Sequence, residues 1–225
     1  MDKKPLEIIL INDAGQQDTW ANLNSDLDKE IWRFGTPTPT YGWDVEDTKE
    51  FWWSDMVKNR WHETLFQDIQ DKMDEIAPHT KNYIFKLINA QAGGRTHGLD
   101  GSIHVDHSFE FNGNGDGFMT FCYFPHTEWD PQWGGDIQFF DPETGQIIAS
   151  FAPMPNTCIA FDSNIPHRGF APTSECKHLR KYISMKTQVS KMWLSSNSVT
   201  FNPVDTKSLD DIRKNIENNP SDDTV

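Results

Sequence analysis

From residue 82 onward the sequence is divided into short apolar runs. The runs are NYIFKLINA, SIHVDHSFEF, FMTFCYF, DIQFFD, QIIASFAP, TCIAFDS, RGF and KYISMKTQV. Between them lie stretches with the composition of turns, among them AGG (92–94), NGNGDG (112–117) and DPETG (141–145). Six to eight short strands separated by turn signals predict an all-β sandwich or barrel.

The first eighty residues add a helical layer to these strands. LEIILIN (6–12) predicts a short buried strand, whereas TPTPTYGW (36–43) indicates a loop. Residues 61–77 predict a helix that ends before Pro78, with its apolar residues on one face: Leu65, Phe66, Ile69, Met73 and Ile76. The predicted fold is therefore mainly β with supporting helices, a double-stranded β-helix (jelly roll) with an N-terminal helical layer.

The length of 225 residues suits one domain with a real core. We expect a single domain over residues 1–200, with its core at 80–190. Residues 201–225 are polar and acidic and predict a tail, in which Ser208 can cap a short helix.

Charge and cysteine content restrict partners and compartment. Asp and Glu number 34 against 20 Lys and Arg, a net charge of −14, which disfavours nucleic acid and anionic membranes as partners. Cys122, Cys158 and Cys176 cannot all pair, so a disulfide scaffold is excluded and a reducing compartment is favoured. The N-terminus lacks the pattern of a signal peptide, and no apolar stretch is long enough to span a bilayer. We expect a cytoplasmic protein.

One group of residues has the chemistry of a metal site. His104 and Asp106 are two apart in a run predicted as a strand, which would point both side chains to one face. His167 follows 61 residues after Asp106, at the start of a later strand. Together they would form the two-His, one-carboxylate facial triad that binds non-haem Fe(II). An isolated HxD pair is common in proteins, so the pattern by itself is also consistent with a surface His–Asp pair that binds no metal. His97 and His126 are candidates to line the mouth of a pocket.

A basic residue follows thirteen positions after His167. Arg180 lies at the start of the last strand, where it could bind a carboxylate with two hydrogen bonds. Alternation groups it with Tyr182, Ser184 and Lys186 and places Lys181 on the other face. Alternation does not tell which of the two faces is inside.

Four runs in order resemble one enzyme family. They are GLDGSIHVD (98–106), WDPQWGGDIQFFD (129–141), FDSNIPHRGFAP (161–172) and LRKYISMK (179–186). Over about residues 80–190 the chain resembles the Fe(II)- and 2-oxoglutarate-dependent oxygenases of the prolyl 4-hydroxylase-like type. The resemblance implies that His104, Asp106 and His167 are the iron ligands and the catalytic centre.

The resemblance also implies a cosubstrate site. Arg180 matches the basic residue that binds the distal carboxylate of 2-oxoglutarate. Tyr182 stands where the family often has Ser or Thr, which keeps Lys181 as a substitute for Arg180. Tyr123 matches a strand tyrosine that hydrogen-bonds the cosubstrate, with Phe124 as the alternative for that position. Glycines 134–135 match the family's glycine pair at the start of a strand.

The implied cofactors are Fe(II), 2-oxoglutarate as cosubstrate and O2, with ascorbate as a further candidate. The implied reaction hydroxylates a prolyl or other peptidyl residue, or a small amino-acid-like substrate, and releases succinate and CO2. Related halogenases replace the carboxylate ligand with a small residue, so the presence of Asp106 favours hydroxylation. Residues 32–60 and 92–101 are candidates to cover the site opening.

Two other classes of protein fit parts of the pattern. A different mononuclear metal enzyme on a cupin-like barrel would typically use HxH where this chain has HxD, and it would not explain Arg180 or the WGG run. A metal-free jelly-roll binding module would have a broken triad, whereas all three residues are present here.

Overall fold

The computed structural model describes residues 7–35, 50–54, 61–106 and 117–191. The chain divides into two units, Met1–Met192 and Trp193–Val225, and every described residue belongs to the first. The predicted loop at 36–43, the predicted C-terminal helix and most of the candidate cover at 32–60 lie outside the described residues. The domain limits therefore stay a prediction.

Two α-helices and two short 3-10 helices are described. They are α1 (Gln17–Leu27), α3 (His62–Ile76), η2 (Pro78–Asn82) and η3 (Pro131–Trp133). The helix predicted at 61–77 is thus confirmed, and it ends just before Pro78. Within the described part of the chain, neither α-helix has the length and apolar character that crossing a bilayer requires.

The strands account for most of the remaining described residues. They are β1 (Ile8–Ile11), β2 (Arg33–Gly35), β3 (Phe51–Ser54), β4 (Tyr83–Arg95), β5 (Gly117–Phe124), β6 (Ile137–Phe140), β7 (Ile147–Phe151), β8 (Thr157–Asp162), β9 (His167–Gly169) and β10 (Arg180–Lys191). Seven of them form an antiparallel sheet in the order β1-β8-β5-β10-β4-β3-β2, and three form a smaller sheet in the order β7-β6-β9.

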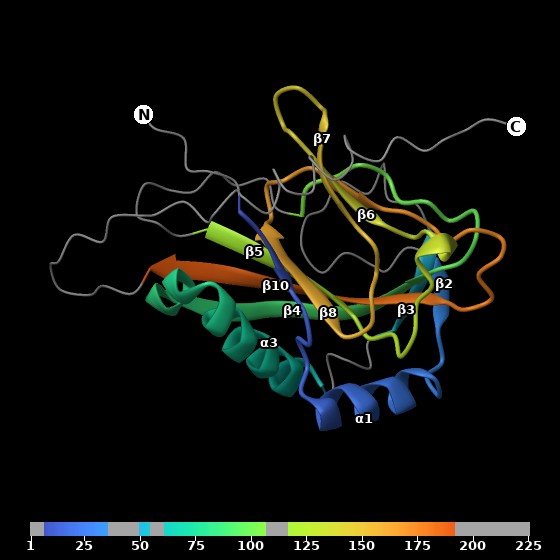
Figure 1. Cartoon of the computed structure of the whole chain (residues 1–225), viewed down its shortest axis with the longest axis horizontal. Helices are drawn as coiled ribbons and strands as arrows, with labels where there is room; N and C mark the ends of the chain where they lie inside the picture. The colour runs from blue at the N-terminus through green and yellow to red at the C-terminus, as the bar shows by residue number, and fades with distance from the viewer. Residues whose placement is uncertain (1–6, 36–49, 55–60, 107–116, 192–225) are drawn as a thin grey trace, which may run out of the picture. The chain divides into compact units, whose positions relative to one another are not determined.

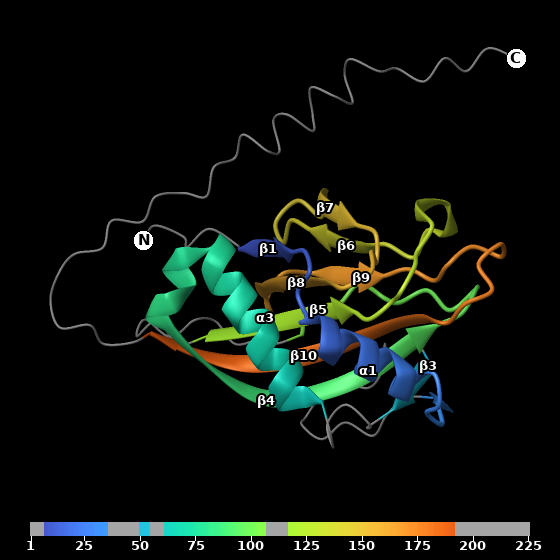
Figure 2. The same cartoon turned by 60° about the horizontal axis from the view of Figure 1, so that its bottom comes forward.

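Helices and sheets are arranged in layers. Helices α1 and α3 cover one face of the seven-stranded sheet, and the three-stranded sheet lies over the other face (Figures 1 and 2). One apolar core joins the helices to the large sheet, with Leu65, Ile69 and Met73 of α3 fully buried. A second core, which includes Phe139 and Phe161, fills the space between the sheets. The predicted jelly roll with a helical layer is confirmed.

Strand β5 separates the two cores by simple alternation. Met119, Phe121 and Tyr123 belong to the helix-side core, whereas Cys122 and Phe124 belong to the core between the sheets. Successive side chains of a strand point to opposite faces, so each residue of β5 has a defined side. The side that faces the small sheet carries the site described below.

Two local predictions differ from the structure. The AGG run at 92–94 lies inside β4 and does not form a turn. A methyl group on Gly93 would come within 2.2 Å of the Tyr182 ring, so glycine is needed there to admit a neighbouring side chain and not to reverse the chain. The run predicted as a strand at 102–111 forms only an isolated bridge at His104 within its described part; its residues 107–111 are outside the described ranges.

The packing of α3 leads to a test of the helix-side core. Ile69 is fully buried, whereas Ile76 on the same helix is 49% exposed. We expect Ile69→Ala to lower the free energy of unfolding by about 2–5 kcal/mol, because it leaves a cavity against the sheet. The matched control Ile76→Ala should change it by about 0.5 kcal/mol or less. Urea denaturation of both variants measures the difference, and equal losses would contradict this description of the core.

Candidate metal centre

Three side chains with metal-binding atoms converge between the sheets. His104, Asp106 and His167 each offer one such atom, and these atoms all lie within 4.8 Å of one another. The backbone brings them together: the amide of His104 donates to the carbonyl of His167 over 3.0 Å, and that of His167 donates back over 2.9 Å. The amide of Asp106 donates to the carbonyl of Ser163 over 2.9 Å. The HxD pair therefore does not lie in a regular strand. It is positioned by backbone pairing with the start of β9.

Each histidine of the cluster is oriented by a backbone carbonyl. The Nδ1 atom of His104 lies 3.0 Å from the carbonyl oxygen of Ser102, and that of His167 lies 2.9 Å from that of Ile165. A carbonyl can only accept, so Nδ1 of each ring carries a proton and Nε2 is the nitrogen left to bind a metal. Both Nε2 atoms lie 3.7 Å from a carboxylate oxygen of Asp106. This is the orientation in which histidines bind metals through Nε2.

Asp106 is a buried carboxylate held in its ionised form. Burial acts to raise its pKa, but the Lys186 ammonium, the two histidines and the Thr120 hydroxyl together hold the pKa well below its usual range. Lys186 Nζ lies 3.1 Å from Oδ1, and the Thr120 hydroxyl donates to Oδ2 over 2.7 Å. The carboxylate is therefore charged and fixed in direction at neutral pH, as a metal ligand must be.

His167 is the buried histidine of the pair. Its ring packs against Phe139 and Phe161, with centroids 5.9 Å and 4.7 Å away. Burial lowers the pKa of His167 to about 4, although Asp106 acts to raise it. The side chain of His104, by contrast, is 47% exposed, so the cluster is open to solvent on one side. Two imidazoles and one carboxylate with an open side fit a divalent metal such as Fe(II).

Arg180 begins β10 and is buried near Gly169 of β9, two residues after His167. Only 2% of its surface is exposed, and its Nε donates a hydrogen bond to the carbonyl of Gly135. Its guanidinium lies over the ring of Phe124, 5.2 Å from the centroid. Burial lowers the pKa of Arg180 to about 10, which leaves it charged at neutral pH. A methyl group on Gly135 would come within 2.9 Å of Arg180 Cδ, so the glycine makes room for this side chain.

Alternation along β10 decides between Arg180 and Lys181. Lys186, which contacts Asp106, shares the parity of Arg180, so the face with Arg180 is the one toward the site. Lys181 is on the other face, and its Nζ lies 2.6 Å from Asp28, which follows α1. The structure thus excludes Lys181 as a substitute for Arg180.

The prediction for Tyr123 is contradicted by the structure. Tyr123 faces the helix-side core, and its hydroxyl donates to Oδ1 of Asn156 over 2.8 Å. Burial raises the pKa of the Tyr123 hydroxyl above its usual value. The alternative residue, Phe124, lies on the site face against Arg180. A one-residue difference in position reverses the face of a strand residue, which explains the error.

Two residues of the site were not predicted to have a role there. Thr120 of β5 and Lys186 of β10 are cross-strand partners, and both contact Asp106. Alternation along the strand places Lys186 on the same face as Arg180 and could have suggested a role for this lysine in the site. The sequence around Thr120 carries no such signal. Of the two candidates for a pocket mouth, His97 is exposed, whereas His126 is buried against Trp129 with ring centroids 4.4 Å apart.

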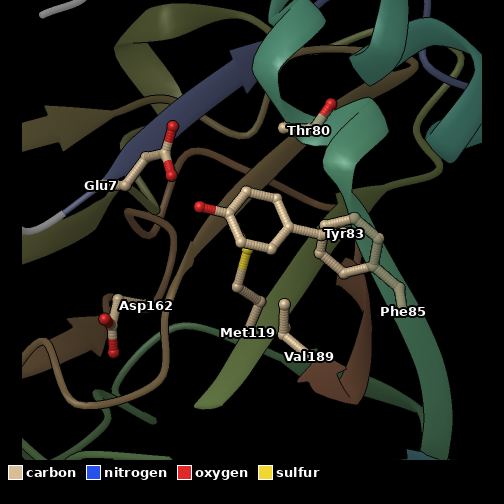
Figure 3. A pocket seen from close by; sticks show the side chains of 7 residues that line it. All are labelled: Glu7, Thr80, Tyr83, Phe85, Met119, Asp162 and Val189. Atoms are coloured by element: carbon tan, nitrogen blue, oxygen red, sulfur yellow. The ribbon is translucent and has the colours of Figure 1, made fainter. Parts of the chain in front are cut away.

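A small pocket lies apart from the cluster. Figure 3 shows the side chains that line it: Glu7, Thr80, Tyr83, Phe85, Met119, Asp162 and Val189. Met119 precedes Thr120 on β5 and therefore points to the opposite face of the sheet. None of the three clustered residues lines this pocket, so it is a separate feature.

Fold and donor set together are those of a mononuclear non-haem iron site on a jelly-roll scaffold. The family model described as "2OG-Fe(II) oxygenase superfamily" matches residues 92–186, a range that contains the three clustered residues and Arg180. The predicted resemblance is confirmed: this part of the chain matches the superfamily of 2-oxoglutarate- and Fe(II)-dependent oxygenases. No curated protein sequence matches the chain significantly.

Solved structures share the fold at low sequence identity. A prolyl hydroxylase from Trichoplax adhaerens, in complex with a hypoxia inducible factor peptide fragment, is 12% identical with a TM-score of 0.52, covering 82% of this chain and 83% of that one. A Pseudomonas putida prolyl-4-hydroxylase is 13% identical with a TM-score of 0.50 (82% and 92%). An oxidoreductase of the 2OG-Fe(II) oxygenase family from Burkholderia pseudomallei is 12% identical with a TM-score of 0.52 (81% and 84%). At these identities the likeness concerns the fold.

The burial of His126 predicts a pH dependence of stability. Burial, together with the nearby charges of Arg180 and Lys181, lowers the pKa of His126 to about 3, from 6.5 for an ordinary histidine. As the pH falls below 6.5, the unfolded chain takes up a proton that the folded chain does not, so folding loses about 1.4 kcal/mol per pH unit from this group. In metal-free protein, His126→Phe should reduce the loss of unfolding free energy between about pH 7 and 5 by about 2 kcal/mol. Denaturation at the two pH values measures it, and equal losses in both proteins would contradict the prediction.

Proposed function

We propose that this protein is an Fe(II)- and 2-oxoglutarate-dependent hydroxylase of prolyl or other peptidyl residues. The observation that carries the proposal is the convergence of His104, Asp106 and His167 with both Nε2 atoms turned toward the carboxylate. In this proposal the three residues bind iron. When bound, iron with 2-oxoglutarate and O2 supplies the oxidising power for hydroxylation, with succinate and CO2 as coproducts.

The residues around the metal ligands keep them in position. The carbonyls of Ser102 and Ile165 hold the two imidazoles, while Thr120 and Lys186 hold the carboxylate. Such outer contacts fix ligand geometry and increase metal affinity. On the buried side, the aromatic rings packed against His167 keep water from that ligand.

Arg180 is proposed to bind the distal carboxylate of 2-oxoglutarate. Its Nε is already bonded to a backbone carbonyl, and its guanidinium is shielded by aromatic rings. A buried guanidinium is costly unless it has an anionic partner, and a carboxylate is the partner it matches best. The proposal thus gives this charge a role that the fold alone does not.

The substrate class is the finer part of the proposal. Two of the structural neighbours are named as prolyl hydroxylases, and one of them is bound to a peptide. The open side of the cluster, at the half-exposed His104, is where a peptide could approach. A free amino acid or similar small molecule is the alternative substrate. Ascorbate as a cofactor, a cytoplasmic location and the absence of nucleic-acid partners stay predictions from the sequence.

Metal binding tests the first part of the proposal. We expect the protein to bind one Fe(II) in anaerobic calorimetry and to form succinate from 2-oxoglutarate in air. His104→Ala, which removes a half-exposed ligand, should weaken metal binding by roughly 100-fold or more and abolish succinate formation. The control is His97→Ala, an exposed histidine outside the cluster, which should stay within about twofold of wild type.

Absence of metal binding in the wild type would reject the enzyme and favour a metal-free binding module. Metal binding with no affinity for 2-oxoglutarate would favour another mononuclear metal enzyme on the same scaffold.

Peptides test the substrate class. Proline-containing peptides should gain the mass of one oxygen atom and form one succinate for each peptide hydroxylated. The same peptides with Ala in place of Pro should not react. Hydroxylation of a free amino acid, with all peptides unchanged, would replace the peptidyl substrate by the small-molecule alternative.

A further inference from the structure

A second buried arginine lies next to Arg180. Arg95, the last residue of β4, is the direct cross-strand partner of Arg180 on β10, and it is 7% exposed. Residues directly opposite in an antiparallel pair point to the same face of the sheet. Arg95 therefore faces the space between the sheets, on the same side as the metal cluster.

Both guanidinium groups reach the same point of the small sheet. A methyl group on Gly169 of β9 would lie 3.6 Å from Arg95 Nε and 3.7 Å from both terminal nitrogens of Arg180. Gly169 is two residues after His167, so this point adjoins the metal cluster. The Arg95 side chain also needs Gly101, where a methyl group would come within 2.9 Å of its Nη2. Two glycines thus leave space around the paired guanidinium groups.

Backbone carbonyls hold each guanidinium by one nitrogen. Nη1 of Arg95 donates to the carbonyl of Leu99 over 2.8 Å, and Nε of Arg180 donates to that of Gly135. Aromatic rings shield both: Phe51 lies 5.7 Å from the guanidinium of Arg95, and Phe124 lies 5.2 Å from that of Arg180. The remaining nitrogens of each fork are oriented in advance and available to an anion.

The charges of this arginine pair are not balanced by direct ion pairs within the described part of the chain, although Asp136 acts from beyond ion-pair distance to raise the pKa of Arg180. No carboxylate there forms an ion pair with either guanidinium. Arg95 itself acts to lower the pKa of Arg180, as expected for a buried like charge. Two like charges opposite each other in a sheet are destabilising, so the pair is better explained by an anionic ligand than by folding.

We infer that Arg95 is a second anchor for the distal carboxylate of 2-oxoglutarate and makes the site selective for a dicarboxylate. This inference rests on the proposed function, since it concerns the same cosubstrate site. The Arg95–Arg180 pair provides two positive charges at one end of the site, and the metal centre provides the other attachment point. A 2-oxo acid without the distal carboxylate would reach only the metal.

Ligand binding to Mn(II)-loaded protein, measured by calorimetry without turnover, tests the inference. The probes are 2-oxoglutarate and 2-oxobutyrate, which share the 2-oxo acid end and differ in the distal carboxylate. We expect Arg95→Gln to weaken 2-oxoglutarate about 10- to 100-fold, the range of one or two hydrogen bonds between charged groups. Binding of 2-oxobutyrate should stay within about threefold, and Arg95→Lys should recover part of the affinity for 2-oxoglutarate.

Arg168→Gln is the matched control. Arg168 lies on β9 beside Gly169, but its guanidinium stacks on Phe170, 4.1 Å from the ring centroid, and Nη2 bonds Gln138. This variant should bind both probes as the wild type does. The melting temperature of each variant without ligand shows whether it is folded.

The outcomes separate the inference from the proposed function. Failure of the Mn(II)-loaded wild type to bind 2-oxoglutarate would overturn both. Wild-type binding with an unchanged affinity in Arg95→Gln would overturn only the inference. An equal loss of affinity for both probes would also overturn it, because Arg95 would then support the site without contacting the distal carboxylate.

Discussion

The pairing of β10 with β4 along one edge and with β5 along the other organises both the large sheet and the site. It places three long strands in the middle of the large sheet and gives every residue of β10 a defined face. One face supplies Ile183 and Met185 to the core under the helices. The other supplies Arg180 and Lys186 to the site, at two levels of the same strand.

The site consists of charged and polar side chains inside an apolar scaffold. A buried carboxylate and buried guanidinium groups are costly in a protein interior, and each is stabilised here by contacts that also fix its direction. Asp106 is held by an ammonium and a hydroxyl, whereas the arginines are held by carbonyls and aromatic rings. Glycines at 93, 101 and 135 are needed because large side chains occupy the space that a Cβ would fill. The glycines of this region thus serve side-chain packing more than chain reversal.

Much of the fold and part of the site could be predicted from the sequence. Short alternating runs and turn signals indicated a jelly roll, and the 3.6-residue period of 61–77 indicated α3, because these patterns reflect which face of an element is buried. The HxD pair, the distant histidine and Arg180 could be named because their residue types suit metal and carboxylate binding. The strand predicted around the HxD pair was wrong in its described part, since hydrogen bonds to His167 and Ser163, far away in the sequence, determine the backbone there.

Other features depended on tertiary structure. Periodicity shows that the two faces of a strand differ but not which one is inside. It therefore cannot choose between Arg180 and Lys181 or between Tyr123 and Phe124, and the register of β5 and β10 decides both. The contacts of Thr120 and Lys186 with Asp106 and the pairing of Arg95 with Arg180 join residues from separate strands. The residue types of the site and the layered fold follow from the sequence, because burial patterns are local. Which charged side chains meet follows from the three-dimensional arrangement alone, because it depends on the pairing of strands distant in the chain.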